Sequence, residues 1–138
     1  MESFDERGEI HAYRFGCEQS TDLRVVPLWG DSHIYKGFDA LINAYKQAAY
    51  NVHKSGPTTF SHTIQKCIEL EQQAGGKQLI VCVLITDGEI SDEPTDMQQI
   101  KLSTDYPISL IGIGVGAGPF GILEDFEQNK VEGKFNNF

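Results

Sequence analysis

Two oxygen-bearing residues in loops, Thr58 and Asp87, are the first candidates for chemistry in this sequence. Asp87 follows "QLIVCVLIT", a nearly continuous apolar run rich in β-branched residues, which is typical of a strand covered on both faces. Thr58 lies in the loop "GPTTF", ahead of a helical pattern. In a parallel α/β sheet, ligands bind beyond the carboxyl ends of the strands, so the two side chains are expected to converge there.

A carboxylate and a hydroxyl with no histidine nearby in sequence form the oxygen-only environment that Mg²⁺ prefers. Asp87 is therefore a candidate metal ligand. Residue types alone favour another reading, in which Asp87-Gly88 is a turn that ends the strand and the aspartate caps backbone amides.

Other patterns point away from catalysis. "GIGVGAG", Gly112 to Gly118, follows a strand as a dinucleotide fingerprint would, but the glycine spacing does not fit. Glycines that allow a helix to pack closely on the sheet explain it better, and a nucleotide-binding enzyme remains a distant alternative. The four histidines have no metal-ligand spacing, and no nucleophile elbow or Cys-His pairing stands out (His11, His33, His53 and His62). The sequence therefore predicts a protein that is not an enzyme.

The elements that must position Thr58 and Asp87 follow from hydrophobic periodicity. The patterns predict strands at 8–16 and 22–30, helices at 38–52 and 60–74, a strand at 78–86, a short helix through Met97 and Leu102, a strand at 106–116, and a helix from 120. Two strands joined by a helix make a right-handed parallel crossover. We expect one domain over residues 1–138: a doubly wound, mainly parallel α/β sheet with helices on both faces. Leu79–Ile85 and Ile108–Ile113 should be neighbouring parallel strands, both buried.

Composition limits the partners and the compartment. The 138 residues carry 20 acids against 11 bases, a net charge of −9, which repels phosphate backbones and anionic membranes. We expect neither nucleic-acid binding nor direct membrane binding. Cys67 and Cys82 fall at core positions and the three cysteines share no metal-ligand spacing, which favours a reducing compartment. With no signal sequence and no membrane-spanning run, a cytoplasmic location is expected.

Several segments together resemble a known family. "GPTTF" followed by a helix, a buried strand and "LITDGEISD" is similar to the von Willebrand factor A fold, specifically its copine branch. The copine-like segments also include "GFDALINAYKQAAYNV" and "PISLIGIGVGAGPFGILEDFE". "GKFNNF" resembles the sequence entering the last strand of plant RING-containing ubiquitin ligases with a copine-like domain. The resemblance runs from about Gly8 to Phe138.

The resemblance implies a metal-ion-dependent adhesion site built from three loops. Thr58 matches the threonine of the second loop and Asp87 the aspartate of the third. The Asp-x-Ser/Thr-x-Ser motif of the first loop is missing, and Asp31-Ser32-His33 lacks its second hydroxyl. The fold is thus expected to be truncated, without its first strand, and any Mg²⁺ or Mn²⁺ should bind weakly.

The resemblance also implies a role. In the family the metal completes its coordination with an acidic residue of a partner, so we expect an intracellular protein-interaction module with an unidentified protein partner. The parent protein would carry calcium-dependent phospholipid-binding modules in the copine case. The alternative is the substrate-recruiting domain of a RING-type ubiquitin ligase. A missing central strand would leave bare strand edges, and we expect the chain to self-associate through them.

Overall fold

The computed structural model describes residues 8–20, 24–55, 59–88, 93–131, 133 and 136–138. The chain divides into two compact units, residues 1–56 and 57–138, and each is described by itself. Mixed helices and strands in both units place the protein in the α/β class, as predicted.

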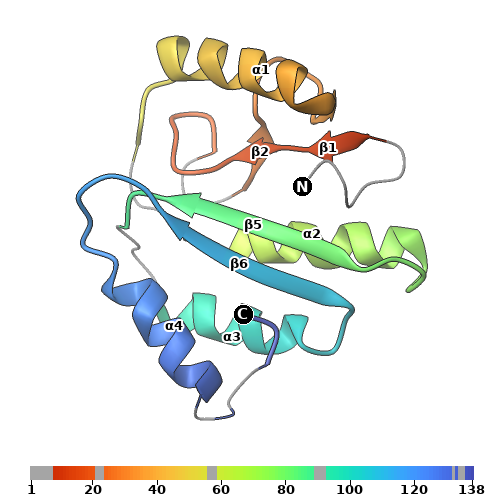
Figure 1. The fold of residues 1–138 in the computed structure, drawn as a ribbon, viewed down its shortest axis with the longest axis vertical. Coiled ribbons are helices and arrows are strands. Elements are labelled where there is room, and N and C mark those ends of the chain that lie inside the picture. The colour runs from red at the N-terminus through yellow and green to blue at the C-terminus, as the bar shows by residue number, and fades with distance from the viewer. Residues whose placement is uncertain (1–7, 21–23, 56–58, 89–92, 132, 134–135) are drawn as a thin grey trace. The chain divides into compact units, whose positions relative to one another are not determined.

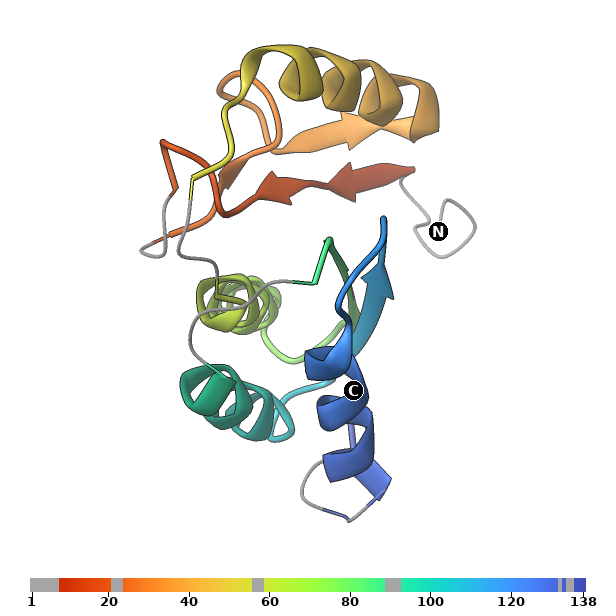
Figure 2. The same ribbon diagram turned by 90° about the vertical axis from the view of Figure 1, so that its left-hand side faces the viewer.

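The first unit contains short antiparallel strands and one helix. Its elements are β1 (Glu9–His11), β2 (Tyr13–Arg14), β3 (Val26–Pro27), β4 (Ile34–Lys36) and α1 (Gly37–Asn51). β1 pairs with β4 and β2 pairs with β3. α1 lies against the β1–β4 ribbon (Figure 2) and turns Ala44 and Ala48 inward. The larger apolar residues of α1 lie outward, with Ile42 46% and Tyr45 63% exposed.

The second unit carries the elements predicted around Thr58 and Asp87. They are α2 (Ser61–Ala74), β5 (Ile80–Thr86), α3 (Glu93–Ser103), β6 (Ile108–Gly114) and α4 (Gly121–Val131). β5 and β6 are parallel neighbours in register from Ile80 opposite Ile108 to Thr86 opposite Gly114 (Figure 1). This confirms the predicted pair of parallel strands joined by a helix.

Only one face of this strand pair is buried, so the prediction that both strands are fully buried is wrong. Side chains alternate between the two faces of a strand. Cys82 and Leu84 of β5 and Leu110 of β6 are buried, whereas Ile85 is 57% and Ile111 44% exposed. The physical reason is that the helices contacting these strands lie on the same face. Cys67 of α2 lies close enough to Cys82 that the two thiols shift each other's pKa, and α4 lies over Gly112, the neighbour of Leu84.

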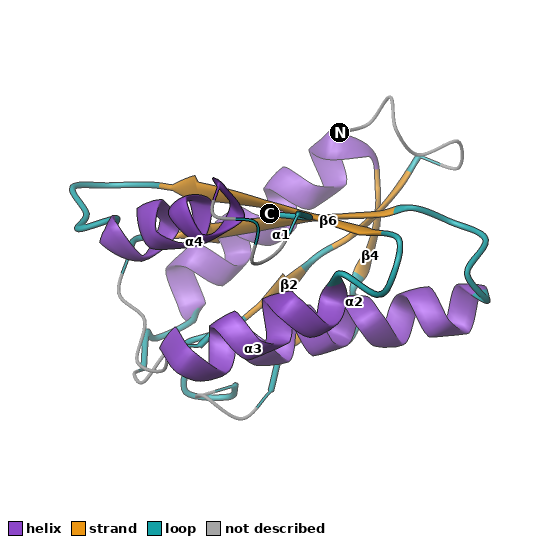
Figure 3. Ribbon diagram, turned by 90° about the horizontal axis from the view of Figure 1, so that it is seen from below, coloured by secondary structure: helices purple, strands orange, loops and turns teal. Residues whose placement is uncertain are grey.

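The core of the second unit lies between that sheet face and the helices. α2 and α3 run side by side (Figure 3). The large apolar side chains with at most 2% exposure are Phe60, Ile64, Leu84, Ile100, Leu110 and Phe126. Each such burial contributes about 1.5–3 kcal/mol relative to exposure, before the entropy of ordering the chain is subtracted.

The end of the chain returns to β6. Leu110 N donates to Asn137 O at 2.6 Å, and Asn137 Nδ2 donates to Ser103 Oγ at 2.7 Å. The Phe138 ring meets Phe126 edge-on, with centroids 5.4 Å apart. A segment with a weak hydrophobic pattern is therefore fixed by two hydrogen bonds and one aromatic contact.

No helix in the described ranges has the length and apolarity needed to cross a membrane.

Candidate functional site

Asp87 lies at the tip of β5, immediately after the last strand residue, and is exposed. The strand end itself is held by Thr86, which is only 6% exposed. Gly88 N donates to Thr86 Oγ1 at 3.2 Å, and Val115 N donates to Thr86 O at 2.8 Å. The local structure thus fixes the backbone on both sides of Asp87 and leaves its side chain accessible from solvent.

Gly88 shows why a glycine must follow that aspartate. Its φ is +110°, a conformation that other residues rarely adopt. A Cβ built there would lie 1.9 Å from the carbonyl oxygen of Pro119. The tip of β5 is therefore in direct backbone contact with the loop that follows β6, and the two strand ends form one edge.

Three helices begin at this same end of the unit. α2, α3 and α4 start where β5 and β6 finish (Figure 1). Helix N-termini carry unsatisfied amides and a partial positive charge, which favour nearby carboxylates. The edge that presents Asp87 is therefore suited to acidic side chains, its own or those of a ligand.

A buried carboxylate joins two of these helix starts. Asp96, in the first turns of α3, is fully buried. Its Oδ1 accepts a hydrogen bond from Ser61 N at 2.7 Å and another from the Thr59 hydroxyl. The Thr59 and Ser61 hydroxyls are 2.9 Å apart and hydrogen-bonded to each other. These contacts tie the entry of α2 to the start of α3.

This cluster bears on the predicted ligand pair. Thr58 adjoins Thr59 but lies outside the described residues, so a shared cleft for Thr58 and Asp87 stays a prediction. Sequence reasoning missed Asp96. The available signal was its spacing, since Asp96, Ile100 and Ser103 form one buried stripe of α3. Leu102, predicted to be part of the helix's apolar pattern, is 47% exposed.

The donor atoms described at this edge fit a hard cation in chemistry but are few. The Asp87 carboxylate offers oxygen ligands, whereas Oδ1 of Asp96 already accepts two hydrogen bonds. Within the described ranges, no group of three or more His, Cys, Asp or Glu side chains could hold a metal ion.

The glycine run after β6 serves packing. A Cβ on Gly114 would lie 2.6 Å from the Phe120 ring, and one on Gly112 would lie 3.0 Å from Leu123. Both contacts come from the chain at or just before α4, so these glycines let that segment approach the sheet closely, as the sequence indicated.

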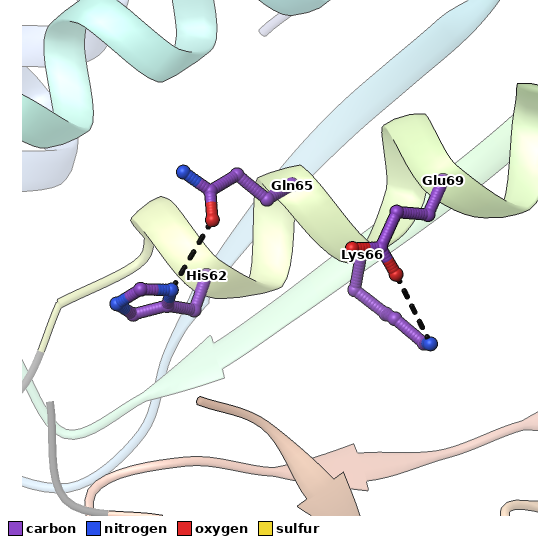
Figure 4. Close-up of polar contacts among 4 residues, drawn as sticks. All are labelled: His62, Gln65, Lys66 and Glu69. Carbon is purple, nitrogen blue, oxygen red and sulfur yellow. Dashed lines mark hydrogen bonds and ion pairs between the residues drawn. The ribbon is translucent and has the colours of Figure 1, made fainter. Parts of the chain in front are cut away.

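Histidine side chains make contacts at two places among the described residues. His62 Nδ1 is 3.2 Å from Gln65 Oε1 on the surface of α2, beside a Lys66–Glu69 ion pair of 3.2 Å (Figure 4). In the first unit the His11 and His33 rings lie 5.4 Å apart. The first contact is local to α2, whereas the second joins β1 to the residue before β4, and sequence spacing did not reveal it.

Comparison with known proteins gives a consistent family. A family model described as Copine matches residues 1–136. Copine family protein 2 of Caenorhabditis elegans is 30% identical over 141 residues, which cover 100% of this chain and 2% of that protein. Copine family protein 1 of the same organism is 28% identical, covering 98% of this chain and 12% of that protein. E3 ubiquitin-protein ligase RGLG2 of Arabidopsis thaliana is 27% identical, and the match covers 100% of this chain and 32% of that protein. The chain thus spans a small part of the relatives it matches.

Proposed function

The chain belongs to the copine family, and we propose that it is an intracellular protein-interaction module that docks partners at the β5–β6 edge. The observation that carries the proposal is the exposed Asp87 carboxylate at the tip of a parallel strand, beside the starts of three helices. In α/β sheets this is the position at which ligands bind. We propose a binding module and not an enzyme.

In this proposal Asp87, with Thr58, holds a Mg²⁺ or Mn²⁺ ion. A bound ion would supply the positive charge that an acidic residue of the partner meets. The role of the chain's own residues is presentation: Thr86 and Gly88 fix the backbone around Asp87, and the helix starts favour an approaching carboxylate.

The first test is metal binding to the full chain. Titration with Mn²⁺, followed by calorimetry and by paramagnetic broadening of amide NMR signals, should give a dissociation constant of about 1 mM or weaker, because so few ligands replace bound water. Broadening should centre on Asp87 and Gly88. Asp87→Ala should abolish it, whereas Asp105→Ala should not, since Asp105 is an exposed acid between the end of α3 and the start of β6. Micromolar binding that survives Asp87→Ala would refute the assignment.

The second test is docking. A short glutamate-containing peptide should shift the Asp87 and Gly88 signals when Mn²⁺ is present. The same peptide with glutamine in place of glutamate should not, and chelation of the metal should reverse the shift. Equal binding of both peptides would contradict docking through an acidic residue.

We further propose that β5 and β6 are part of a doubly wound sheet of the von Willebrand factor A type. The parallel register and the helical crossover support this topology. The net charge of −9 supports a protein that binds neither nucleic acid nor anionic membranes by itself. The buried free thiols of Cys67 and Cys82 support a cytoplasmic location.

Substrate recruitment for ubiquitin transfer is the second candidate function. It is favoured by the match of the whole chain to E3 ubiquitin-protein ligase RGLG2. The complete gene sequence distinguishes the two roles. Lipid-binding modules would support the copine role, and a Cys/His zinc module of the RING type would support recruitment.

A further inference from the structure

We propose that Asp96 is the positioning residue of this docking edge, holding the entry of α2 at a fixed place relative to the segment that carries Asp87. The inference rests on the proposed function, because it names the residue that keeps the two parts of that site in register. Asp96 does not contact the partner or the ion in this proposal. It acts through Thr59 and Ser61.

The geometry shows how one side chain fixes two elements. Oδ1 of Asp96 accepts the Ser61 amide at 2.7 Å and the Thr59 hydroxyl, while Ser61 N also lies 3.1 Å from Thr59 Oγ1. Three polar groups, namely Oδ1 of Asp96, the Thr59 hydroxyl and the Ser61 amide, therefore meet at the entry of α2. Because the hydrogen bonds come from both backbone and side chain, they fix the direction of the chain as well as its distance from α3.

Simple stabilisation of the core does not require a carboxylate here. Asp96 is fully buried, and removing a charged group from water costs free energy that an apolar residue of similar size would avoid. The starts of α2 and α3 offset part of that cost through their partial positive charge. What the carboxylate adds is an acceptor that reaches two points on the chain leading into α2, which an apolar side chain cannot provide.

Ser103 provides the contrast within the same helix. It lies on the same buried stripe of α3 and is also fully buried. Its hydroxyl donates to Ile100 O of its own helix at 2.7 Å and accepts from Asn137 near the chain's end. Ser103 thus supports the helix at the end away from the docking edge, and Asp96 connects the edge itself.

The connection to Asp87 runs through the packing of α2. This helix contacts both α3, whose first turns contain Asp96, and β5, whose tip carries Asp87. Gly88 is packed against Pro119, which fixes the backbone next to Asp87. A shift of the α2 entry relative to α3 would therefore also be a shift relative to Asp87.

The experiment compares three variants of the full chain: Asp96→Ala, Asp96→Asn and Ser103→Ala. Asp96→Ala removes the shared acceptor. Asp96→Asn retains Oδ1 as an acceptor and serves as the conservative rescue. Ser103→Ala removes a buried hydrogen-bonding group at the other end of the same helix. Each is measured by hydrogen exchange of the Ser61 amide relative to that of Leu84, and by Mn²⁺ titration.

Asp96→Ala is expected to accelerate Ser61 exchange about tenfold relative to Leu84 and to weaken Mn²⁺ binding about 10- to 100-fold. In Asp96→Asn, Ser61 exchange and Mn²⁺ affinity should both return most of the way to their wild-type values. Ser103→Ala should lower the unfolding midpoint while leaving both readouts at the wild-type value. If Asp96→Ala does not fold, Thr59→Val is used instead, because it replaces only the hydroxyl with a methyl group. It should give a smaller acceleration of Ser61 exchange and a smaller loss of Mn²⁺ affinity.

Two results would overturn the inference: unchanged Ser61 exchange in Asp96→Ala, or an equal loss of Mn²⁺ affinity in Ser103→Ala. A different result would contradict the proposed function itself. In that case wild-type Mn²⁺ broadening is absent at Asp87, and Ser61 exchange alone decides whether Asp96 fixes the edge.

Discussion

At the scale of single residues, protonation of the Cys82 thiol makes the stability of the second unit depend on pH. Its hydrogen bond with Cys67 and its burial raise the pKa of the Cys82 thiol well above the ordinary value of 9.0. The folded chain therefore keeps this proton at a pH at which the unfolded chain has lost it. The resulting stabilisation is complete below pH 9.0 and is lost as the pH rises above that value.

The hydrogen bond with Cys82 lowers the pKa of Cys67, which acts in the opposite direction, so the test uses a Cys67→Ala background. The prediction is that, in this background, the difference in unfolding free energy between the chain with Cys82 and the chain with Cys82→Ala narrows as the pH is raised from about 8 to about 10, because burial still raises the pKa of Cys82. Urea unfolding at each pH measures it, and the packing loss in the variant cancels because it does not depend on pH. Folded wild-type protein at about pH 8 should also resist alkylation at Cys82. A pH-independent difference would contradict the prediction.

Residue types predicted one half of the candidate site and not the other. Asp87 could be placed at a strand tip because the apolar run before it is long and ends in Asp-Gly, and the structure puts it there, exposed. Asp96 could not be found in this way. Its hydrogen-bond donors, Thr59 and Ser61, are far away in sequence, and local pattern alone gives an acid in the first turns of a helix an exposed capping role.

At the scale of elements, the one-sided burial of β5 gives a prediction from two adjacent residues. Leu84 is 1% exposed and Ile85 57%. Leu84→Ala should lower the free energy of unfolding by about 2–5 kcal/mol, because it removes buried methyl groups and leaves a cavity. Ile85→Ala should change it by about 0.5 kcal/mol or less, as at other surface positions. Urea unfolding compares them, and equal losses would show that both faces of β5 are buried.

The length of the hydrophobic pattern in each element explains where the prediction of helices and strands succeeded and where it failed. α1, α2 and the β5–β6 pair were predictable because each carries a long hydrophobic pattern, whereas α3 has almost no helical hydrophobic period. β4 lies in the mostly polar "DSHIYK" and was missed, since three residues carry too short a pattern. The runs in β5 and β6 are apolar on both faces, so sequence could not show that helices of this unit cover only one.

At the scale of the whole molecule, that uncovered face bears on self-association. Val81, Ile85, Ile111, Ile113 and Val115 are each 40–57% exposed and belong to β5, β6 and the residue after it. Among the described residues, β5 pairs with β6 alone. Exposed edges and contiguous apolar surface favour pairing with another chain. The net charge of −9 opposes it, and salt screens that repulsion.

We therefore predict that the chain self-associates, and more strongly in about 0.5 M salt than in about 0.05 M, where charge repulsion between copies acts over a longer range. Light scattering on a size-exclusion column measures this over a range of protein concentrations. A variant with Ile85→Lys and Ile111→Lys should shift the population toward monomer, because it places charges on the apolar face. Ile42→Lys, which changes an exposed apolar residue of α1, is the matched control and should not. A wild-type mass of 15.4 kDa at every protein and salt concentration would show that the chain is a stable monomer, and would contradict the prediction.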